Sequence, residues 1–189
     1  MATRVLIAED ETIIRRDLRA LLASSGFDVC AEARDGVEAV ALATTATPDV
    51  AVLDVKMPRL DGVEAARRIL AERPLPIVLL TAYGDAELIA RAAEAGVFAY
   101  LVKPFREQDL VPAIRTAQAR HAELVKLRVE THTLREALEA RKAIERAKGI
   151  LMAKEGLTEA EAFERLRRAS QRSGRPMKVI ADAVAATLA

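Results

Sequence analysis

Apolar and polar positions alternate along the first part of the chain in a way that predicts strands and helices in turn. Short, continuously apolar runs are typical of strands buried on both faces of a parallel sheet. Five such runs occur, at Val5–Ala8, Val29–Glu32, Val50–Leu53, Ile77–Leu80 and Phe98–Val102. Amphipathic stretches separate or follow them, at residues 12–24, 36–45, 62–71 and 86–95 and from about Glu107. This pattern predicts an α/β fold, a doubly wound parallel sheet with helices on both faces.

The pattern changes after Pro104, and from Ala117 on no strand is predicted. Leucines here follow the a/d spacing of a heptad repeat for about three heptads, but Arg120 also falls in the seam. Two interpretations remain open, a modest coiled coil and a long amphipathic connector. The seam consists of Leu124, Leu127, Leu134 and Leu138, with Ala117 and Thr131 at the other positions.

The end of the chain is predicted to form three short helices. The first reaches Gly156, Thr158 and Glu161 form a capping box for the second, and Pro176 starts the third. Each helix carries one apolar stripe, which indicates a small all-α bundle. The stripes are Ile144, Ala147 and Leu151, then Phe163 and Leu166, then Ile180, Val184 and Leu188. We therefore divide the chain into a domain at 1–118, a helical linker or coiled coil at 119–140 and a helical domain at 141–189.

Composition and charge narrow the class of protein. Hydrophobic residues make up 51% of the chain and charged residues 30%, with one cysteine, Cys30, as expected in a reducing cytoplasm. No apolar run is long enough to span a membrane, so we expect a cytoplasmic protein with no membrane partner. Residues 1–120 carry 15 basic and 18 acidic side chains, and residues 135–189 carry 12 and 8. The net charge is therefore −3 for residues 1–120 and +4 for residues 135–189, and this opposite sign suggests that the two regions have different partners.

Polar residues follow several of the predicted strands at the sheet edge where ligands bind in open α/β folds. Three carboxylates gathered there repel one another by about 4 kcal/mol per pair at 4 Å and an effective dielectric near 20. A divalent cation and an ammonium group would remove that repulsion, and hard oxygen ligands favour Mg²⁺. One aspartate at a strand end is more often a helix cap, so the prediction depends on the whole set. That set is Glu9, Asp10, Asp54, Thr81 and Lys103.

This set lies within four sequence motifs, "AEDE", "VLDVKMPRLDG", "LLTAYG" and "YLVKPF". With them the chain resembles, from residue 4 to about 118, the receiver domain of bacterial two-component response regulators. The resemblance implies a flavodoxin-like (βα)5 fold and a phospho-acceptor that receives its phosphoryl group from a sensor histidine kinase. It implies no turnover of a separate substrate, because the domain catalyses only its own phosphorylation and dephosphorylation.

The resemblance also implies a role for each motif residue. Asp54 is the expected phospho-acceptor, and Mg²⁺ is expected to bind Asp10, Asp54 and the backbone carbonyl of Lys56, with Glu9 acting through water. The resemblance implies that Lys103 contacts the phosphoryl oxygens. It further implies that Thr81 swings toward the phosphate, that Tyr100 turns inward behind it, and that the Lys103–Pro104 bond is cis, an isomer adopted by only about 5–6% of such bonds.

The tail decides what such a receiver controls. No catalytic grouping appears in residues 121–189, and the two histidines, His121 and His132, are interpreted as solvated helix positions. The last two helices resemble a DNA-reading helix-turn-helix only superficially, because the final helix offers Lys178 and little else to base edges. Base stacking is not expected either, because Phe163, the only aromatic residue of the tail, falls on the apolar stripe.

With these interpretations disfavoured, the main remaining feature of the tail is a basic face on its first two helices. From charge alone, this face is either a nucleic-acid-binding surface or an ordinary solvated surface. The stretch "ARKAIERAKGILMAKEGLTEAEAFERLRRASQRSGRPMKVIADAV" resembles an ANTAR domain over about residues 120–188, most clearly at 147–152, Ala162–Phe163 and Leu166–Arg167 with Ser170. The resemblance implies binding to stem-loop RNA, prevention of transcription termination, and a homodimer assembled on phosphorylation. The basic residues expected to bind RNA are Arg146, Lys148, Lys154, Arg167, Arg168 and Arg172. Two alternatives remain, a DNA-binding response regulator and a receiver whose helical tail binds only protein.

Overall fold

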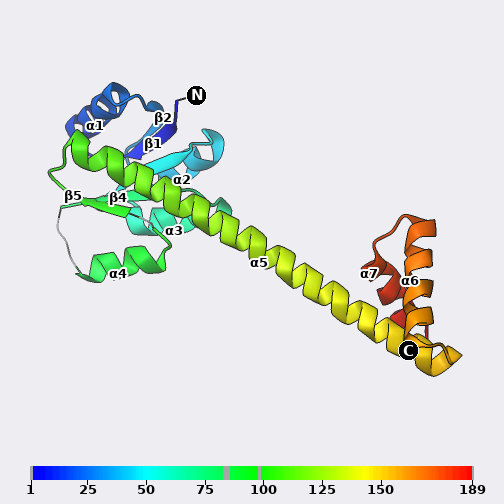
Figure 1. Ribbon diagram of the computed structural model, residues 1–189. Coiled ribbons are helices and arrows are strands. Elements are labelled where there is room, and N and C mark those ends of the chain that lie inside the picture. Colours follow the sequence, from blue (N-terminus) through cyan, green and yellow to red (C-terminus); the bar gives the residue numbers. More distant parts are fainter. Residues whose placement is uncertain (1, 83–85, 98, 189) are drawn as a thin grey trace. The chain divides into compact units, whose positions relative to one another are not determined.

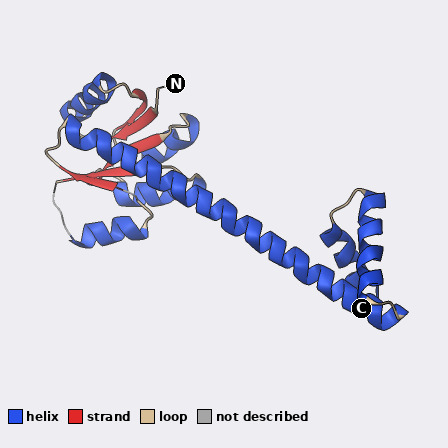
Figure 2. Ribbon diagram, viewed as in Figure 1, coloured by secondary structure: helices blue, strands red, loops and turns tan. Residues whose placement is uncertain are grey.

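The computed structural model describes residues 2–82, 86–97 and 99–188, and it divides the chain into two compact units, Met1–Val125 and Lys126–Ala189. Figure 1 labels the helices and strands, and Figure 2 shows that the strands all belong to the first unit. Among the described residues, no helix combines the length and apolar character that a membrane span needs.

The first unit is built on a five-stranded parallel sheet, as predicted. The strands are β1 (Arg4–Ala8), β2 (Asp28–Ala33), β3 (Val50–Asp54), β4 (Ile77–Thr81) and β5 (Ala99–Val102), in the order β2-β1-β3-β4-β5. The strand predicted to begin at Phe98 is described from Ala99 on, because Phe98 lies outside the described residues. The helices between strands are α1 (Thr12–Ser24), α2 (Gly36–Thr45), α3 (Gly62–Glu72) and α4 (Ala86–Glu94).

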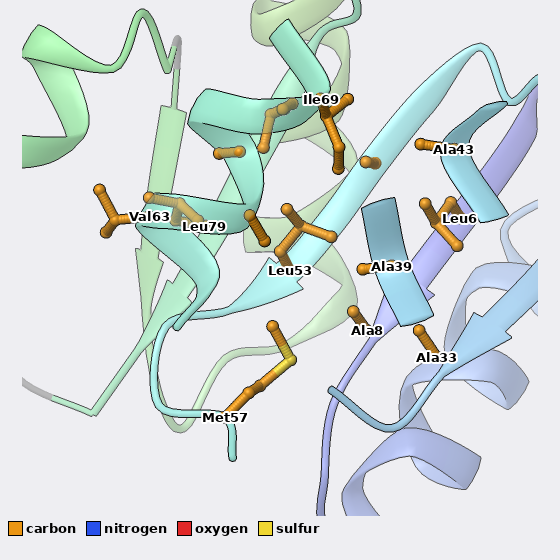
Figure 3. Close-up of a cluster of buried hydrophobic side chains, with 14 of the residues drawn as sticks. Leu6, Ala8, Ala33, Ala39, Ala43, Leu53, Met57, Val63, Ile69 and Leu79 are labelled. Carbon is orange, nitrogen blue, oxygen red and sulfur yellow. The ribbon is translucent and has the colours of Figure 1, made fainter. Parts of the chain in front are cut away.

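Helices cover both faces of this sheet, and each face has its own apolar cluster. On one face, side chains of α2 and α3 pack on strand residues such as Leu6, Leu53 and Leu79 (Figure 3), and Ala92 of α4 belongs to the same cluster. On the other, α1 and the first part of α5 pack on Val5, Val52 and Leu80, among others. Because both faces are covered, β3 and β4 are buried along their whole length, which explains their continuously apolar sequence.

Helix α5 (Glu107–Glu155) is one continuous helix of 49 residues that contributes to both units. The predicted linker and the first helix of the tail are therefore segments of a single element. Ala117, predicted as a seam residue, is instead fully buried in the core of the first unit, so the heptad seam begins after it. The seam leucines are exposed, with relative exposures of 40% at Leu124 and 71% at Leu134.

The second unit consists of the end of α5, α6 (Glu159–Ser173) and α7 (Met177–Leu188) around a small apolar core. Thr158 and Glu161 form the predicted capping box, and Gly174 ends α6 in the left-handed conformation at φ 67°. The core consists of Ala147, Leu151, Ala162, Leu166 and Ala181. Phe163 does not belong to it: its side chain is 42% exposed, so its predicted inward position is wrong.

Candidate functional site

Three carboxylates meet at the carboxyl-end edge of the sheet. Glu9 and Asp10 follow β1 and Asp54 ends β3, and one oxygen from each lies within 4.8 Å of the others. We call these three residues the acid pocket. Glu9 is fully buried and Asp54 is 5% exposed, whereas Asp10 is open to solvent. The donor set consists only of hard oxygen atoms, and the side that carries Asp10 is open to solvent, which fits a Mg²⁺ ion that keeps several water ligands.

Lys103 provides the positive charge of the site. Its Nζ lies 2.6 Å from Oε2 of Glu9 and 2.7 Å from Oδ1 of Asp54. Burial raises the pKa of both carboxyl groups, although the hydrogen bonds from Lys103 act in the opposite direction. Burial by itself lowers the pKa of Lys103, but its hydrogen bonds to Asp54 and Glu9 outweigh that effect and raise the pKa overall. The ammonium is therefore held charged between two buried acids.

The backbone joins Lys103 to the remaining predicted site residues. The Lys103 amide donates to the carbonyl oxygen of Thr81 at 2.7 Å, and Thr81 is 6% exposed beside the acid pocket. The Lys103–Pro104 bond is cis, the isomer that the sequence resemblance implied. Tyr100 is 45% exposed, so in this structure its ring faces outward.

The turn that follows β3 is held against Asp54 by a glycine. The Gly62 amide donates to the Val55 carbonyl at 2.9 Å, and a Cβ on Gly62 would lie 2.0 Å from the Asp54 carbonyl oxygen. Only glycine allows the start of α3 to approach the end of β3 so closely. The same turn contains Lys56, whose side chain is exposed and whose carbonyl is the expected metal ligand.

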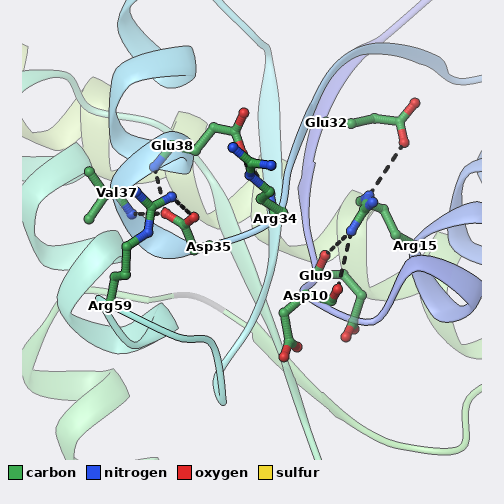
Figure 4. A network of polar contacts seen from close by, with 9 residues as sticks. All are labelled: Glu9, Asp10, Arg15, Glu32, Arg34, Asp35, Val37, Glu38 and Arg59. Atoms are coloured by element: carbon green, nitrogen blue, oxygen red, sulfur yellow. Dashed lines mark hydrogen bonds and ion pairs between the residues drawn. The ribbon is translucent and has the colours of Figure 1, made fainter.

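Arg15 of α1 binds the backbone of the acid pocket, a contact that was not predicted from the sequence. Its Nη1 donates to the carbonyl oxygen of Glu9 at 2.6 Å and approaches that of Asp10 at 3.4 Å, while its Nε lies 3.8 Å from Glu32 (Figure 4). The guanidinium thus fixes the backbone from which two of the three carboxylates project. The helical spacing from residue 12 places Arg15 at the start of α1, but nothing in the spacing indicates which carbonyl groups it meets.

A second ion pair joins the loops after β2 and β3. Asp35 caps α2 through the amides of Val37 and Glu38, is only 2% exposed, and pairs with Arg59 (Figure 4). Arg59 holds a left-handed backbone conformation at φ 65°, which is unfavourable for a residue with a side chain. The ion pair therefore compensates for local strain and anchors the turn that carries Lys56.

The six basic residues expected to bind RNA divide into two groups in the second unit. Lys148 is only 7% exposed, and its Nζ lies 2.9 Å from Glu145 and 2.6 Å from Glu159. Arg167 and Arg168 both bind the carboxylate of Glu164. Within the described part of the chain, three of the six are exposed and form no ion pair: Arg146, Lys154 and Arg172.

Comparison with known protein families matches each unit separately. Residues 5–115 match the response regulator receiver domain, and residues 132–184 match the ANTAR domain. The chain belongs to the ANTAR-type response regulators. This membership agrees with the sequence resemblance and with the flavodoxin-like sheet.

Relatives and solved structures support the same assignment. The chain is 50% identical over 185 residues to the transcriptional regulatory protein PdtaR of Mycobacterium tuberculosis, covering 98% of this chain and 90% of that protein. The receiver of a modulated diguanylate cyclase from Desulfovibrio desulfuricans G20 has a TM-score of 0.60, at 36% identity over 65% of this chain and 98% of that one. The receiver of the response regulator NarL from M. tuberculosis has a TM-score of 0.59, at 30% identity over 62% and 97%.

Proposed function

We propose that this response regulator is phosphorylated on Asp54 by a sensor histidine kinase and then binds stem-loop RNA, thereby preventing transcription termination. The observation that supports the first step most directly is the position of Lys103, whose ammonium lies within 2.7 Å of both Asp54 and Glu9. A buried carboxylate beside a fixed cation is suited to accept a phosphoryl group, whose additional charge needs neutralising.

In this proposal the phosphoryl group moves from a histidine nitrogen of the kinase to a carboxylate oxygen of Asp54. The N–P bond breaks, an O–P bond forms, and water later hydrolyses the acyl phosphate. Mg²⁺, held by Asp10, Asp54 and the Lys56 carbonyl with Glu9 acting through water, supplies charge neutralisation when bound. Lys103 contacts the phosphoryl oxygens, Thr81 turns toward them, and Tyr100 then turns inward. The domain acts only on itself.

The output step rests on the ANTAR unit and its cations. Arg146, Lys154 and Arg172 are exposed without ion pairs, and we propose that they contact phosphates. Arg167 and Arg168 remain proposed contacts that would first have to exchange a carboxylate partner for RNA. Lys148, which the sequence placed in the same set, is proposed instead to join α5 to α6 through its ion pairs with Glu145 and Glu159. We also propose that phosphorylation favours a homodimer, because the exposed leucines at 124, 127, 134 and 138 recur at heptad spacing.

The deciding experiment is a binding titration with and without a beryllofluoride–Mg²⁺ complex, which mimics the phosphoryl group. A stem-loop RNA and a DNA duplex of equal charge are compared at fixed salt, because charge alone drives non-specific binding. Tighter RNA binding on activation is the expected result. Preference for duplex DNA would instead favour a DNA-binding response regulator, and binding to neither would favour a protein partner. Asp54→Asn is the control that should not respond to beryllofluoride.

A further inference from the structure

Phe163 is a large apolar side chain that the fold of the ANTAR unit leaves in contact with water. Its ring is 42% exposed, and it is absent both from the buried core and from the partly buried side chains packed on it. It is also the only aromatic residue after Phe105. The neighbouring positions Ala162 and Leu166 are fully or almost fully buried, so α6 directs them inward while Phe163 lies at the edge of that face.

Two of the acidic groups near Phe163 along α6 are paired with cations. One turn before it, Glu159 accepts a hydrogen bond from Lys148 at 2.6 Å, which lowers the pKa of the glutamate. The adjacent Glu164 binds Arg167 and Arg168, which lower its pKa to about 2. These two carboxylates thus remain ionised but repel a polyanion less, because each is paired with a cation. The third, Glu161, is bound by Thr158 in the capping box at the start of the helix and not by a cation.

The unit also has exposed basic side chains that form no ion pair with a carboxylate of the described residues. Besides the three proposed phosphate contacts, further basic side chains of the second unit are exposed and form no ion pair among the described residues, namely Arg128, Arg135, Arg141, Arg175 and Lys178. An exposed aromatic ring on a unit with unpaired cations is the combination by which proteins bind unstacked bases, with cations on the phosphates and the ring on a base.

We propose that Phe163 is a stacking platform for an unpaired base in the loop of the RNA. A duplex does not offer such a base, because its bases are stacked on one another. Phe163 would therefore make the ANTAR unit select stem-loops with an open loop over continuous duplexes, while the unpaired cations bind both. This inference rests on the proposed RNA-binding function and adds to it the part of the RNA that is recognised and the residue that recognises it.

The test uses the full chain activated with beryllofluoride–Mg²⁺ and a hairpin library with one stem and a randomised loop. Wild-type protein selects hairpins from the library, and their affinity is compared with that of the same stem as a continuous duplex. Phe163→Leu keeps an apolar side chain but removes the ring, and Phe163→Tyr keeps the ring. Met152→Ala is the control for loss of an exposed apolar side chain, since Met152 is 40% exposed on α5.

We expect Phe163→Leu to weaken hairpin binding by about 5- to 150-fold, because stacking on one base contributes about 1–3 kcal/mol and 1.4 kcal/mol is tenfold. Its affinity for the duplex should not change, and Phe163→Tyr and Met152→Ala should bind the hairpin as wild type does. With 2-aminopurine at the stacked loop position, wild type and Phe163→Tyr should quench the fluorescence and Phe163→Leu should not.

Equal hairpin affinity of wild type and Phe163→Leu would overturn the stacking proposal and leave the RNA-binding function intact. An equal loss on hairpin and duplex would also overturn it, since the substitution would then act through the fold. A changed oligomeric state of RNA-free Phe163→Leu would show that the ring lies at an interface between copies of the chain. If wild type selects no hairpin, the proposed function fails and this inference fails with it.

Discussion

A Cβ atom on Gly62 would lie 2.0 Å from the carbonyl oxygen of Asp54. The start of α3 therefore contacts the backbone of the proposed phospho-acceptor with no room for a side chain. The position of Asp54 thus depends on Gly62, a residue that has no side chain.

Gly62→Ala should displace Asp54 and destabilise the receiver. We expect the free energy of unfolding to fall by about 1–3 kcal/mol, the range for overpacked sites, and beryllofluoride binding to weaken. Denaturant unfolding and a beryllofluoride titration measure the two effects. Gly149→Ala is the matched control, because no atom lies within 4 Å of its added Cβ and the helix should gain about 0.5–1 kcal/mol. Unchanged beryllofluoride binding by Gly62→Ala would contradict the dependence of Asp54 on this contact.

Lys103→Gln should remove the cation that lies between Glu9 and Asp54. We expect labelling of Asp54 by a small phosphodonor such as acetyl phosphate to slow by about tenfold or more, since one well-placed charge typically contributes that much. Lys103→Arg should also be slow, because a planar guanidinium does not replace a compact ammonium between two carboxylates. Intact-protein mass spectrometry measures the labelling. Lys56→Ala is the control, because the Lys56 side chain is exposed and only its backbone carbonyl is required. Labelling of Lys103→Gln at the wild-type rate would refute the role of the Lys103 ammonium in phosphorylation.

Arg59 combines an ion pair with an unfavourable backbone conformation, and two substitutions separate the effects. Arg59→Ala loses the ion pair with the buried Asp35 and keeps the strain at φ 65°, so we expect a loss of about 1–3 kcal/mol in the free energy of unfolding. Arg59→Gly loses the same ion pair but relieves the strain, and should be more stable than Arg59→Ala by about 1 kcal/mol. Denaturant unfolding of the two variants tests this order. Equal stabilities would mean that the backbone conformation is not strained.

The sheet and the acid pocket could be predicted from sequence because the strands are short apolar runs and four of them end in, or are followed directly by, a polar residue of the site. Asp54 and Lys103 are recognisable since a charged residue directly after an apolar run is conspicuous. The contacts of Arg15 and Arg59 could not be predicted from spacing. Arg59 meets Asp35 from 24 positions away, and Arg15 reaches the carbonyl groups of Glu9 and Asp10 across a turn whose path depends on the finished fold.

Two side chains of the second unit, Phe163 and Lys148, have surroundings that helix periodicity did not predict. Phe163 lies three residues before the buried Leu166, so the stripe pattern placed both inward, but Ala162 occupies the inward position in the fold. Lys148 was predicted to be an RNA contact, and its pairing with Glu159 was not predicted because that glutamate belongs to the next helix, 11 positions later. Whether a helical position at the edge of a buried face is itself buried depends on how neighbouring helices cross, which periodicity does not specify.

Acidification should release Mg²⁺ from the acid pocket. Burial raises the pKa of Glu9 and Asp54, so protons occupy these groups at a higher pH than they occupy ordinary carboxylates, and only the ionised forms bind metal. We expect the increase in Tm caused by Mg²⁺ to shrink as the pH falls from about 7 toward 5. Asp10→Asn should abolish the increase at every pH, whereas Asp17→Asn, at an exposed position of α1, should retain it. An increase independent of pH, or one retained by Asp10→Asn, would argue against metal binding here.

The basic residues of the ANTAR unit should separate into those that bind RNA and one that holds the helices together. Arg146→Ala, Lys154→Ala and Arg172→Ala should each weaken RNA binding, leave the Tm unchanged, and reduce the slope of log affinity against log salt by about 1. Lys148→Met should instead lower the Tm of this unit, because it breaks the ion pairs with Glu145 and Glu159 while keeping the apolar stem.

Well below its Tm, the Lys148→Met protein should keep the wild-type salt slope, since its ammonium is bound by carboxylates before RNA arrives. Calorimetry and salt-dependent titrations on the same preparations make the comparison. Lys142→Ala is a control for loss of a paired but exposed cation, because Lys142 already binds Glu139. A salt slope reduced by about 1 at an unchanged Tm in Lys148→Met would assign Lys148 to the RNA interface after all. It would also mean that RNA displaces Glu159, so that binding would loosen the contact between α5 and α6.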